Sequence, residues 1–531
     1  MRKTAITFML MLAAAVGYAQ SVYDGLLFSE NNYEGTARSV AMGNAFTALG
    51  GDLGSVSINP AGSAVAKYSQ FTITPGLTIT SSTAQGVSPY SDGTLPYFER
   101  KMRSTMTNLS LPNMGMTLNW DTNRKSGVKN ISFGFVMNKS AGYDQDVYAN
   151  GLNSTTSFMG AMAVDATGIT ASELNATDAY NYLPWSTIVG YQSGMISTFG
   201  GYDDEYVGAS ELIFDNGDIV LGGDIEQTYG RRVTGSKYDY VFNFGANISD
   251  FLYLGANLGI SSTVYGYEDY FKEAAVDPSD FEIALDNGKN LYFSQMKYRY
   301  SYNVEGSGYY AKVGAIVTPG AGLRFGAAIQ TPIVNTIMER WQYSGSTEFT
   351  SSSYDGYAYS PYGEYSYTLV SPFRANLGLA YTFGKYAVIS ADYEVCDYGQ
   401  MRFKSNGSDR DYFEELNDII KENFTTSNIW RFGAELKLGA LAVRGGYGFT
   451  TSPERQYDGP YRSNMSLGFG YSSKGSFYAD FAIRRNTYSK EYYMPYSDYI
   501  FDDDGNIAEP VPELVITRSD WKALLTFGWR F

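Results

Sequence analysis

Arginines recur on the polar side of stretches in which apolar and small or polar residues alternate. The four that could contact the head group of a ligand are Arg324, Arg431, Arg444 and Arg484. A guanidinium presents a planar fork of donors that matches a carboxylate, so one or two of these side chains could clamp such a ligand. The alternative is structural, because arginines in the interior of a protein can also hold a segment that fills this interior, by pairing with acids such as Glu435 and Asp480.

The chain of 531 residues contains no histidine and a single cysteine, Cys396. Without histidine, the commonest general base, the usual zinc or haem ligand and any Ser–His or Cys–His pair are missing. We therefore expect no catalytic residues, no metal site and no cofactor, and haem uptake would have only Tyr or Met as axial ligands. The formal net charge of −16 argues against nucleic acid as a partner.

The N-terminus has the features of a secretory signal peptide. Arg2 and Lys3 precede an apolar stretch over residues 6–16, and small residues at Gly17 and Ala19 permit cleavage before Gln20. We predict a signal peptide over residues 1–19. After it, no apolar run approaches the roughly 20 residues that a membrane helix needs, so a membrane-spanning form would have to be a barrel.

A small-residue segment over residues 35–62 precedes the rest of the chain. Thr36 can cap a short helix there, and Gly50 and Gly51 can end it. A rigid turn follows at Asn59, Pro60, Ala61 and Gly62. By itself this pattern also fits a surface helix and loop.

From about Lys67 onward the dominant pattern has a period of two, as in residues 114–120, 240–248 and 252–260. One face of each such strand is apolar and the other is small or polar, which is typical of strands between lipid and a wet lumen. Aromatic residues make up 16% of the chain and charged residues only 18%, which suits a barrel better than a soluble α/β enzyme.

The connections alternate between short turns and long links, and the pairs predict about fourteen strands, an even number. Short turns are expected near Ser249-Asp250, Pro319-Gly320, Gly384-Lys385, Gly439 and residues 473–475. Long links are expected at about 144–234, 267–290, 343–365, 397–427, 450–462 and 488–518. The last strand alternates from Trp521 and ends the chain on Phe531.

Two features resemble known outer-membrane proteins. The terminal strand ending on Phe531 resembles the signal read by the outer-membrane assembly machinery, which would then be a partner. Residues 41–48, Gly51-Asp52 and Asn59-Pro60-Ala61-Gly62 resemble the hatch of FadL-type transporters, which carry fatty acids and other hydrophobic compounds across the outer membrane of Gram-negative bacteria.

The FadL-type resemblance implies an all-β, fourteen-stranded transmembrane barrel over residues 67–531, with an N-terminal helical hatch over residues 20–66 that plugs the lumen. It implies capture of a hydrophobic ligand at extracellular loops, gating by Asn59, Pro60, Ala61 and Gly62, and sideways release where an early strand is kinked. No proline marks that kink in the third strand, and Gly142 is a weak substitute. The surrounding outer-membrane lipid and lipopolysaccharide would also be partners.

The long link at 144–234 departs from the family and has helix-like content. Four residues in it could form an adaptable apolar entry site: Phe158, Met162, Leu183 and Trp185. Alternatively, the link packs its own small core over the barrel mouth. We expect passive, hatch-gated transport of long-chain fatty acid-like molecules, with a structural or adhesive barrel as the alternative and a lipid hydrolase disfavoured by the missing histidine.

Overall fold

The structure is a computed structural model that describes residues 21–88, 97–214, 218–285, 289–405, 407, 409–457, 459–473, 476–502 and 504–531. The predicted signal peptide and part of the predicted turn at 473–475 lie outside these residues. No helix within the described ranges is long and apolar enough to span a bilayer.

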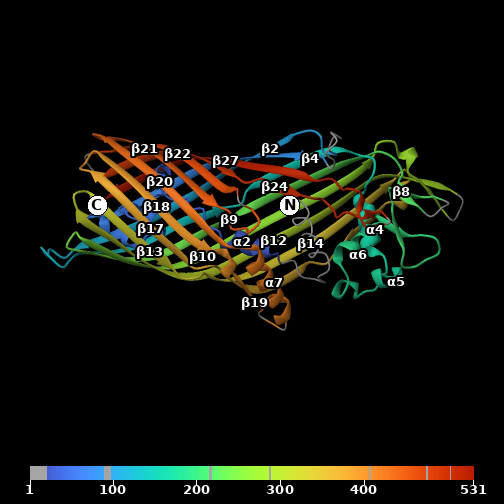
Figure 1. The fold of residues 1–531 in the computed structure, drawn as a ribbon, viewed down its shortest axis with the longest axis horizontal. Helices are drawn as coiled ribbons and strands as arrows, with labels where there is room; N and C mark the ends of the chain where they lie inside the picture. The colour runs from blue at the N-terminus through green and yellow to red at the C-terminus, as the bar shows by residue number, and fades with distance from the viewer. Residues whose placement is uncertain are drawn as a thin grey trace.

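A closed antiparallel barrel of fourteen strands forms most of the molecule (Figure 1), which confirms the predicted strand number. Neighbours in the chain pair with each other, and the first strand pairs with the last along its whole length. Four barrel strands are each broken into two segments, namely β3 with β4, β13 with β14, β16 with β17, and β18 with β19.

The barrel segments in chain order are β1 (Gln70–Gly86), β2 (Met102–Asp121), β3 (Val128–Gly142), β4 (Gln145–Asn153), β9 (Ile225–Ile248), β10 (Leu252–Ala275), β12 (Asn290–Gly320), β13 (Leu323–Gln330), β14 (Val334–Phe349), β16 (Gly363–Val370), β17 (Arg374–Phe383), β18 (Ala387–Asp397), β19 (Arg402–Ser405), β20 (Thr426–Leu438), β21 (Leu441–Thr451), β22 (Pro460–Ser472), β23 (Phe477–Tyr488) and β27 (Leu514–Arg530).

The outward face of the wall carries large apolar side chains. Phe133 on β3 lies opposite Phe244 on β9, with ring centroids 5.1 Å apart, and Phe135 lies opposite Phe242 at 5.2 Å. These four rings are all well exposed. A soluble protein rarely exposes such a continuous apolar surface, so the wall is built to face hydrocarbon.

The two ends of the barrel differ in their connections. Tight turns such as Ser249-Asp250 lie at one end, together with the C-terminus (Figure 1). At the other end the strands are longer than predicted: β10 continues to Ala275 and β14 to Phe349, so the predicted links at 267–290 and 343–365 begin too early. The hydrogen-bonded pairing of the strands is intact at this end. The outward face is polar, however, as in the Arg299–Glu268 ion pair at 2.8 Å. The alternation of apolar and polar residues that indicates a membrane strand is therefore lost there.

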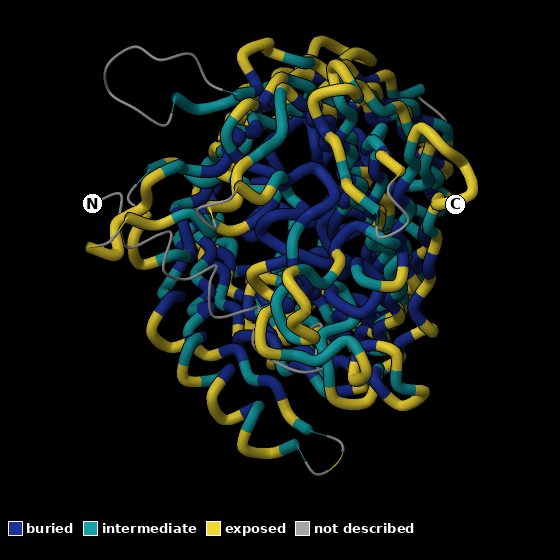
Figure 2. Tube along the Cα trace, turned by 90° about the vertical axis from the view of Figure 1, so that its right-hand side faces the viewer, coloured by how far each residue is buried: buried dark blue, intermediate teal, exposed yellow. Residues whose placement is uncertain are grey.

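The N-terminal segment fills the centre of the barrel. Seen from the long-link end, the middle of the molecule is occupied by buried residues (Figure 2). The Thr36 side chain accepts a hydrogen bond from the Ser39 amide, as expected of a cap, although the helix it caps is short. This segment contains α2 (Val22–Ser29), α3 (Ala37–Ala41), and the 3-10 helices η2 (Leu53–Ser57) and η3 (Pro60–Val65).

A helical cap lies over the long-link end, and one further helix, α7, projects from the side of the wall (Figure 1). The cap contains α4 (Phe158–Ala166), α5 (Ala171–Leu174), η4 (Ala179–Asn181), α6 (Trp185–Gln192), β5 (Ile196–Thr198), β6 (Tyr206–Gly208), β7 (Glu211–Ile213) and β8 (Ile219–Leu221). The remaining elements are η5 (Pro278–Asp280), β11 (Glu282–Ala284), η6 (Ser352–Tyr354), β15 (Gly356–Tyr359), η7 (Tyr398–Gln400), α7 (Arg410–Asn423), β24 (Glu491–Tyr493), β25 (Ile500–Phe501) and β26 (Ile507–Glu509).

Candidate functional site

The predicted gating residues lie in the hatch and are fully buried against the wall. Asn59 caps η3 by accepting a hydrogen bond from the Ala61 amide at 3.1 Å, and its amide nitrogen donates to the carbonyls of Thr47 at 2.7 Å and Ala315 at 3.1 Å. One side chain therefore joins two parts of the hatch to β12. The Pro60 carbonyl accepts from Asn243 on β9 at 3.0 Å, and Gly62 accepts from the Gly51 amide at 2.8 Å.

Paired glycines in the wall bring the hatch backbone into direct contact with the strands. Gly433 on β20 lies opposite Gly446 on β21, and a Cβ at Gly446 would lie 2.1 Å from the amide nitrogen of Gly43. Gly255 on β10 likewise lies opposite Gly314 on β12, and a Cβ at Gly314 would lie 2.1 Å from Oδ1 of Asn59. The hatch consequently fits only because these wall positions have no side chain.

Two of the four predicted arginines donate to hatch carbonyls. Arg324 on β13 donates to Ala48 at 2.9 Å and to Leu49 at 2.8 Å. Arg484 on β23 donates to the Tyr33 carbonyl at 3.1 Å, while its Nε and Nη2 have no hydrogen-bond partner among the described residues.

The other two arginines are in buried ion clusters. Arg431 donates to Glu394 at 2.6 Å, and Arg374 donates to the other oxygen of the same carboxylate at 2.8 Å. Arg444 bridges Glu435 and Asp480, at 2.6 Å to each. The hatch joins this second cluster, because Arg38 on α3 also pairs with Glu435 at 2.9 Å. The structure thus places all four predicted arginines where they hold the plug or balance buried acids.

The wall parts between its second and third strands. β2 pairs with β3 only from Asn113 opposite Asn138 toward the tight-turn end. Beyond that point β2 pairs with β1 alone, and β3 and β4 pair with β9 alone, among the described residues. The register of β3 against β9 slips between Lys139 and Ala141. The bend therefore lies just before Gly142, in a strand that contains no proline.

The hatch occupies the edge of β3 that β2 leaves free. The Asn32 amide donates to the Ser140 carbonyl at 2.6 Å, and the Glu34 amide donates to the Lys139 carbonyl at 2.8 Å. The Glu34 carboxylate is buried and forms an ion pair with Lys522 on β27. The extended segment after α2 thus takes the place of a neighbouring strand at this one point of the wall.

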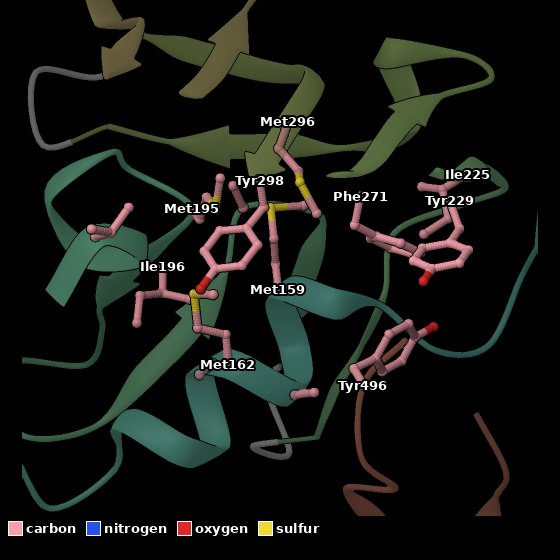
Figure 3. Packing of buried hydrophobic residues seen from close by; sticks show 14 of the residues in the cluster. Met159, Met162, Met195, Ile196, Ile225, Tyr229, Phe271, Met296, Tyr298 and Tyr496 are labelled. Atoms are coloured by element: carbon pink, nitrogen blue, oxygen red, sulfur yellow. The ribbon is translucent and has the colours of Figure 1, made fainter. Parts of the chain in front are cut away.

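The apolar residues predicted in the long link lie in the cap. Phe158 packs against Phe271 and Tyr298, with ring centroids 5.3 and 5.0 Å away. Met162 belongs to a methionine-rich core at the long-link end of the barrel (Figure 3). Leu183 packs against the same core. Trp185 instead packs beneath the cap, where its ring lies 5.7 Å from that of Trp341 on β14. The link therefore forms a packed core over the mouth.

A second apolar cluster lies below the cap, inside the barrel. α2 contributes Val22, Leu26 and Phe28, and the wall contributes Tyr302 and Trp341. α2 was not predicted as a separate helix, although it lies within the predicted hatch; the capping box of Ser21 and Asp24 is the sequence signal that could have indicated its start. Lys237 was also not predicted, yet it is buried and donates to the Phe28 carbonyl at 2.9 Å.

No protein-family model and no curated protein matches this sequence. Solved structures do match it in fold. A FadL homologue from Pseudomonas aeruginosa superposes with a TM-score of 0.51 at 12% identity, covering 94% of this chain and 99% of the other. The toluene transporter TodX from Pseudomonas putida superposes with a TM-score of 0.50 at 12% identity, covering 95% and 99%.

The chain has the FadL-type fold. The match extends over nearly the whole of both chains.

Proposed function

We propose that this protein is an outer-membrane transporter for hydrophobic or amphipathic small molecules, through which ligands of the long-chain fatty acid type pass by passive, hatch-gated diffusion. The observation that carries the proposal is the edge of β3, which is bonded to residues Asn32–Glu34 of the hatch in place of β2. A shift of this hatch segment, with release of the hydrogen bond that Asn108 on β2 donates to Asp144 at 2.6 Å across the gap, would free a passage from the lumen into the bilayer. A water-filled route to the far side is unnecessary for an apolar ligand.

The apolar lumen below the cap supports the same function. α2 fills it with Val22, Leu26 and Phe28, so a chain of methylene groups could replace these side chains with a similar burial of apolar surface. The two relatives in fold add support, since one is described as a toluene transporter and the other as a FadL homologue. In this proposal residues 1–19 are a signal peptide, residues 20–66 the hatch, and the 144–234 segment of the 67–531 barrel contains the extracellular cap.

Native mass spectrometry of the barrel extracted in mild detergent tests this function. We expect a co-purified amphiphile in the unaltered protein and its loss when Asn59→Ala and Pro60→Ala are combined, because Asn59 ties two hatch segments to β12. Asp277→Ala, on an exposed link, is the control and should retain the amphiphile. A barrel that is empty, and that binds no added cis-parinaric acid (a fluorescent fatty acid), would refute the proposal.

A further inference from the structure

The wall parts a second time, between its ninth and tenth strands. The pairing of β18 with β20 ends where Asp397 lies opposite Thr426. One more bond follows, from the Tyr398 amide to the Thr425 carbonyl at 3.1 Å. Beyond it β19 pairs with β16, whereas the Thr425 amide donates to Pro453 and Phe424 bridges to Glu454, after the end of β21. Among the described residues, no strand pairs with the free edge of β19.

Helix α7 covers this second gap from the outside. The side-chain amide of Asn417 accepts from the Phe403 amide at 2.8 Å and donates to the Phe403 carbonyl at 2.9 Å. One asparagine thereby supplies the two hydrogen bonds that a neighbouring strand would give β19. Phe413, Leu416 and Ile420 are buried against the wall, while the opposite face of α7 is charged and exposed. The charged face suits the head-group layer of a bilayer and not its hydrocarbon core.

Helix α2 covers the same gap from the inside. The ring of Tyr23 lies 5.6 Å from that of Phe424, just after α7, in an edge-to-face arrangement. Gly25 faces β19 so closely that a Cβ there would lie 2.9 Å from the ring of Phe403. Figure 1 shows α2 within the barrel beside the point where α7 and β19 project. Without α7 and α2, an apolar lumen cluster would face the outer leaflet.

The two gaps lie on opposite sides of the barrel and are joined by the hatch. Seven of the fourteen strands separate them on each side, namely those from β3 to β19 and those from β20 through β27 and β1 to β2. The N-terminal segment contacts the second gap through α2 and the first gap through residues 32–34. A displacement of α2 therefore pulls directly on the segment that occupies the edge of β3.

We propose that the gap between β19 and β20 is a lateral entrance by which an amphiphile with one apolar chain passes from the outer leaflet into the lumen, with α7 as its movable cover. The apolar chain of the amphiphile takes the position of α2 when the amphiphile enters. The inference rests on the proposed transport function and adds the entry route, at the wall opposite the release site. Entry from the side also explains how a ligand reaches the lumen below a cap with its own packed core.

A cysteine reporter behind α7 tests the entrance. Cys396→Ala removes the single native thiol, and Leu26→Cys then places one thiol on the buried face of α2. The rate at which N-ethylmaleimide labels this thiol is measured with the protein in phosphatidylcholine vesicles. Asn417→Ala should raise the labelling rate roughly tenfold, since two hydrogen bonds that hold α7 are lost. Asp418→Ala, the next residue on the exposed face, is the matched control and should leave the rate unchanged.

A second reporter separates opening of α7 from general loosening. Val56→Cys lies in another buried cluster of the hatch, and its labelling should not respond to Asn417→Ala. Should Asn417→Ala fail to fold, Asn417→Asp keeps an acceptor for the Phe403 amide and loses the donor to its carbonyl, so an intermediate rate is expected. Equal labelling of Leu26→Cys in the Asn417 and Asp418 variants, or equal acceleration at both reporters, would overturn the entrance.

Uptake of cis-parinaric acid by the same vesicles distinguishes the two proposals. If the unaltered barrel takes up the probe no faster than empty vesicles, the transport function fails. If the barrel accelerates uptake but Asn417→Ala changes neither uptake nor labelling, transport stands and the entrance fails. Faster uptake with Asn417→Ala, and not with Asp418→Ala, supports both.

Discussion

Arg374, Arg484 and Lys237 each donate to a backbone carbonyl of the hatch, at 2.6, 3.1 and 2.9 Å. These carbonyls belong to a segment without regular secondary structure or to the end of α2, and within the hatch only the Tyr33 carbonyl has a side-chain donor, Asn44 at 2.7 Å, among the described residues. Basic side chains of the wall therefore donate hydrogen bonds to backbone carbonyls of the hatch. Acidic side chains elsewhere in the lumen balance their positive charge. Basic side chains of the kind that suggested ligand binding in the sequence here bind a segment of the same chain.

The buried carboxylate of Glu394 has a large expected effect on stability. Glu394→Gln leaves Arg374 and Arg431 buried without a counter-charge, so we expect a loss of about 3–5 kcal/mol in the free energy of unfolding. Urea unfolding followed by gel mobility measures this change. The exposed pair Arg340–Glu364 provides the control: Glu364→Gln should cost at most about 1 kcal/mol. Similar losses at both positions would contradict the role of the buried cluster.

The cap should lose stability as the pH rises. Burial, together with the nearby carboxyl of Glu273, raises the pKa of Glu211 to about 7. The pKa in the folded state is above that in the unfolded state, so the stabilisation is complete below about pH 4.5 and is lost as the pH rises through about 7. Hydrogen exchange of the α4 amides, corrected for intrinsic rates, should show weaker protection at pH 8 than at pH 5.

Glu211→Gln should remove this pH dependence of α4 protection, because the amide stays neutral. Glu173→Gln is the control, since hydrogen bonds with Thr170 lower the pKa of Glu173 and it stays ionised above pH 5. An unchanged pH dependence in Glu211→Gln would assign the effect to another group.

At the scale of elements, the hatch and the wall form one packed unit, because glycines in the wall let the hatch backbone contact the strands. Gly445 and Gly446 are adjacent in β21 but face opposite sides of the wall. A Cβ at Gly446 would meet the hatch backbone at 2.1 Å, whereas the nearest atom to a Cβ at Gly445 is the end of Leu467 at 3.9 Å. The alternation of the strand thus decides which glycine is required.

Gly446→Val should displace the hatch while the barrel still folds, at a cost of about 1–3 kcal/mol from overpacking. Limited proteolysis of the N-terminal segment measures the displacement, and we expect faster cleavage. Gly445→Val should leave the cleavage rate unchanged. A hatch equally protected in both variants would show that the close approach at Gly446 can be relieved elsewhere.

The sequence could predict those elements whose pattern is imposed by the membrane. Strands such as β2, β9 and β27 alternate because one face meets lipid, and Thr36 caps a helix as expected. The ends of β10 and β14 could not be predicted, since no hydrocarbon selects their outward residues. The roles of Asn417 and Gly446 also could not be predicted, because they depend on contacts between distant parts of the chain.

The molecule as a whole is a barrel with a filled lumen (Figure 2). Hatch residues 21–66 fill the centre of the lumen and the cap closes one end. We therefore expect the full-length protein to show almost no ion conductance in a planar bilayer. Deleting residues 21–66 should give discrete conductance steps, because a lumen lined by buried charges such as Arg444 and Glu394 would fill with water. No conductance after the deletion would mean that the barrel collapses or the cap seals it.

The contacts of the hatch with the last strand constrain the order of assembly. The Ala37 amide donates to Thr526 on β27 at 2.7 Å, and Glu34 pairs with Lys522 on the same strand. β27 is also the strand that joins β1 to complete the cylinder. The hatch therefore contributes a hydrogen bond and an ion pair to the strand at which the cylinder closes, so we expect it to be in place when β27 pairs with β1. One strand, β27, thus both completes the cylinder and binds the N-terminal hatch, which links closure of the wall to the seating of the hatch.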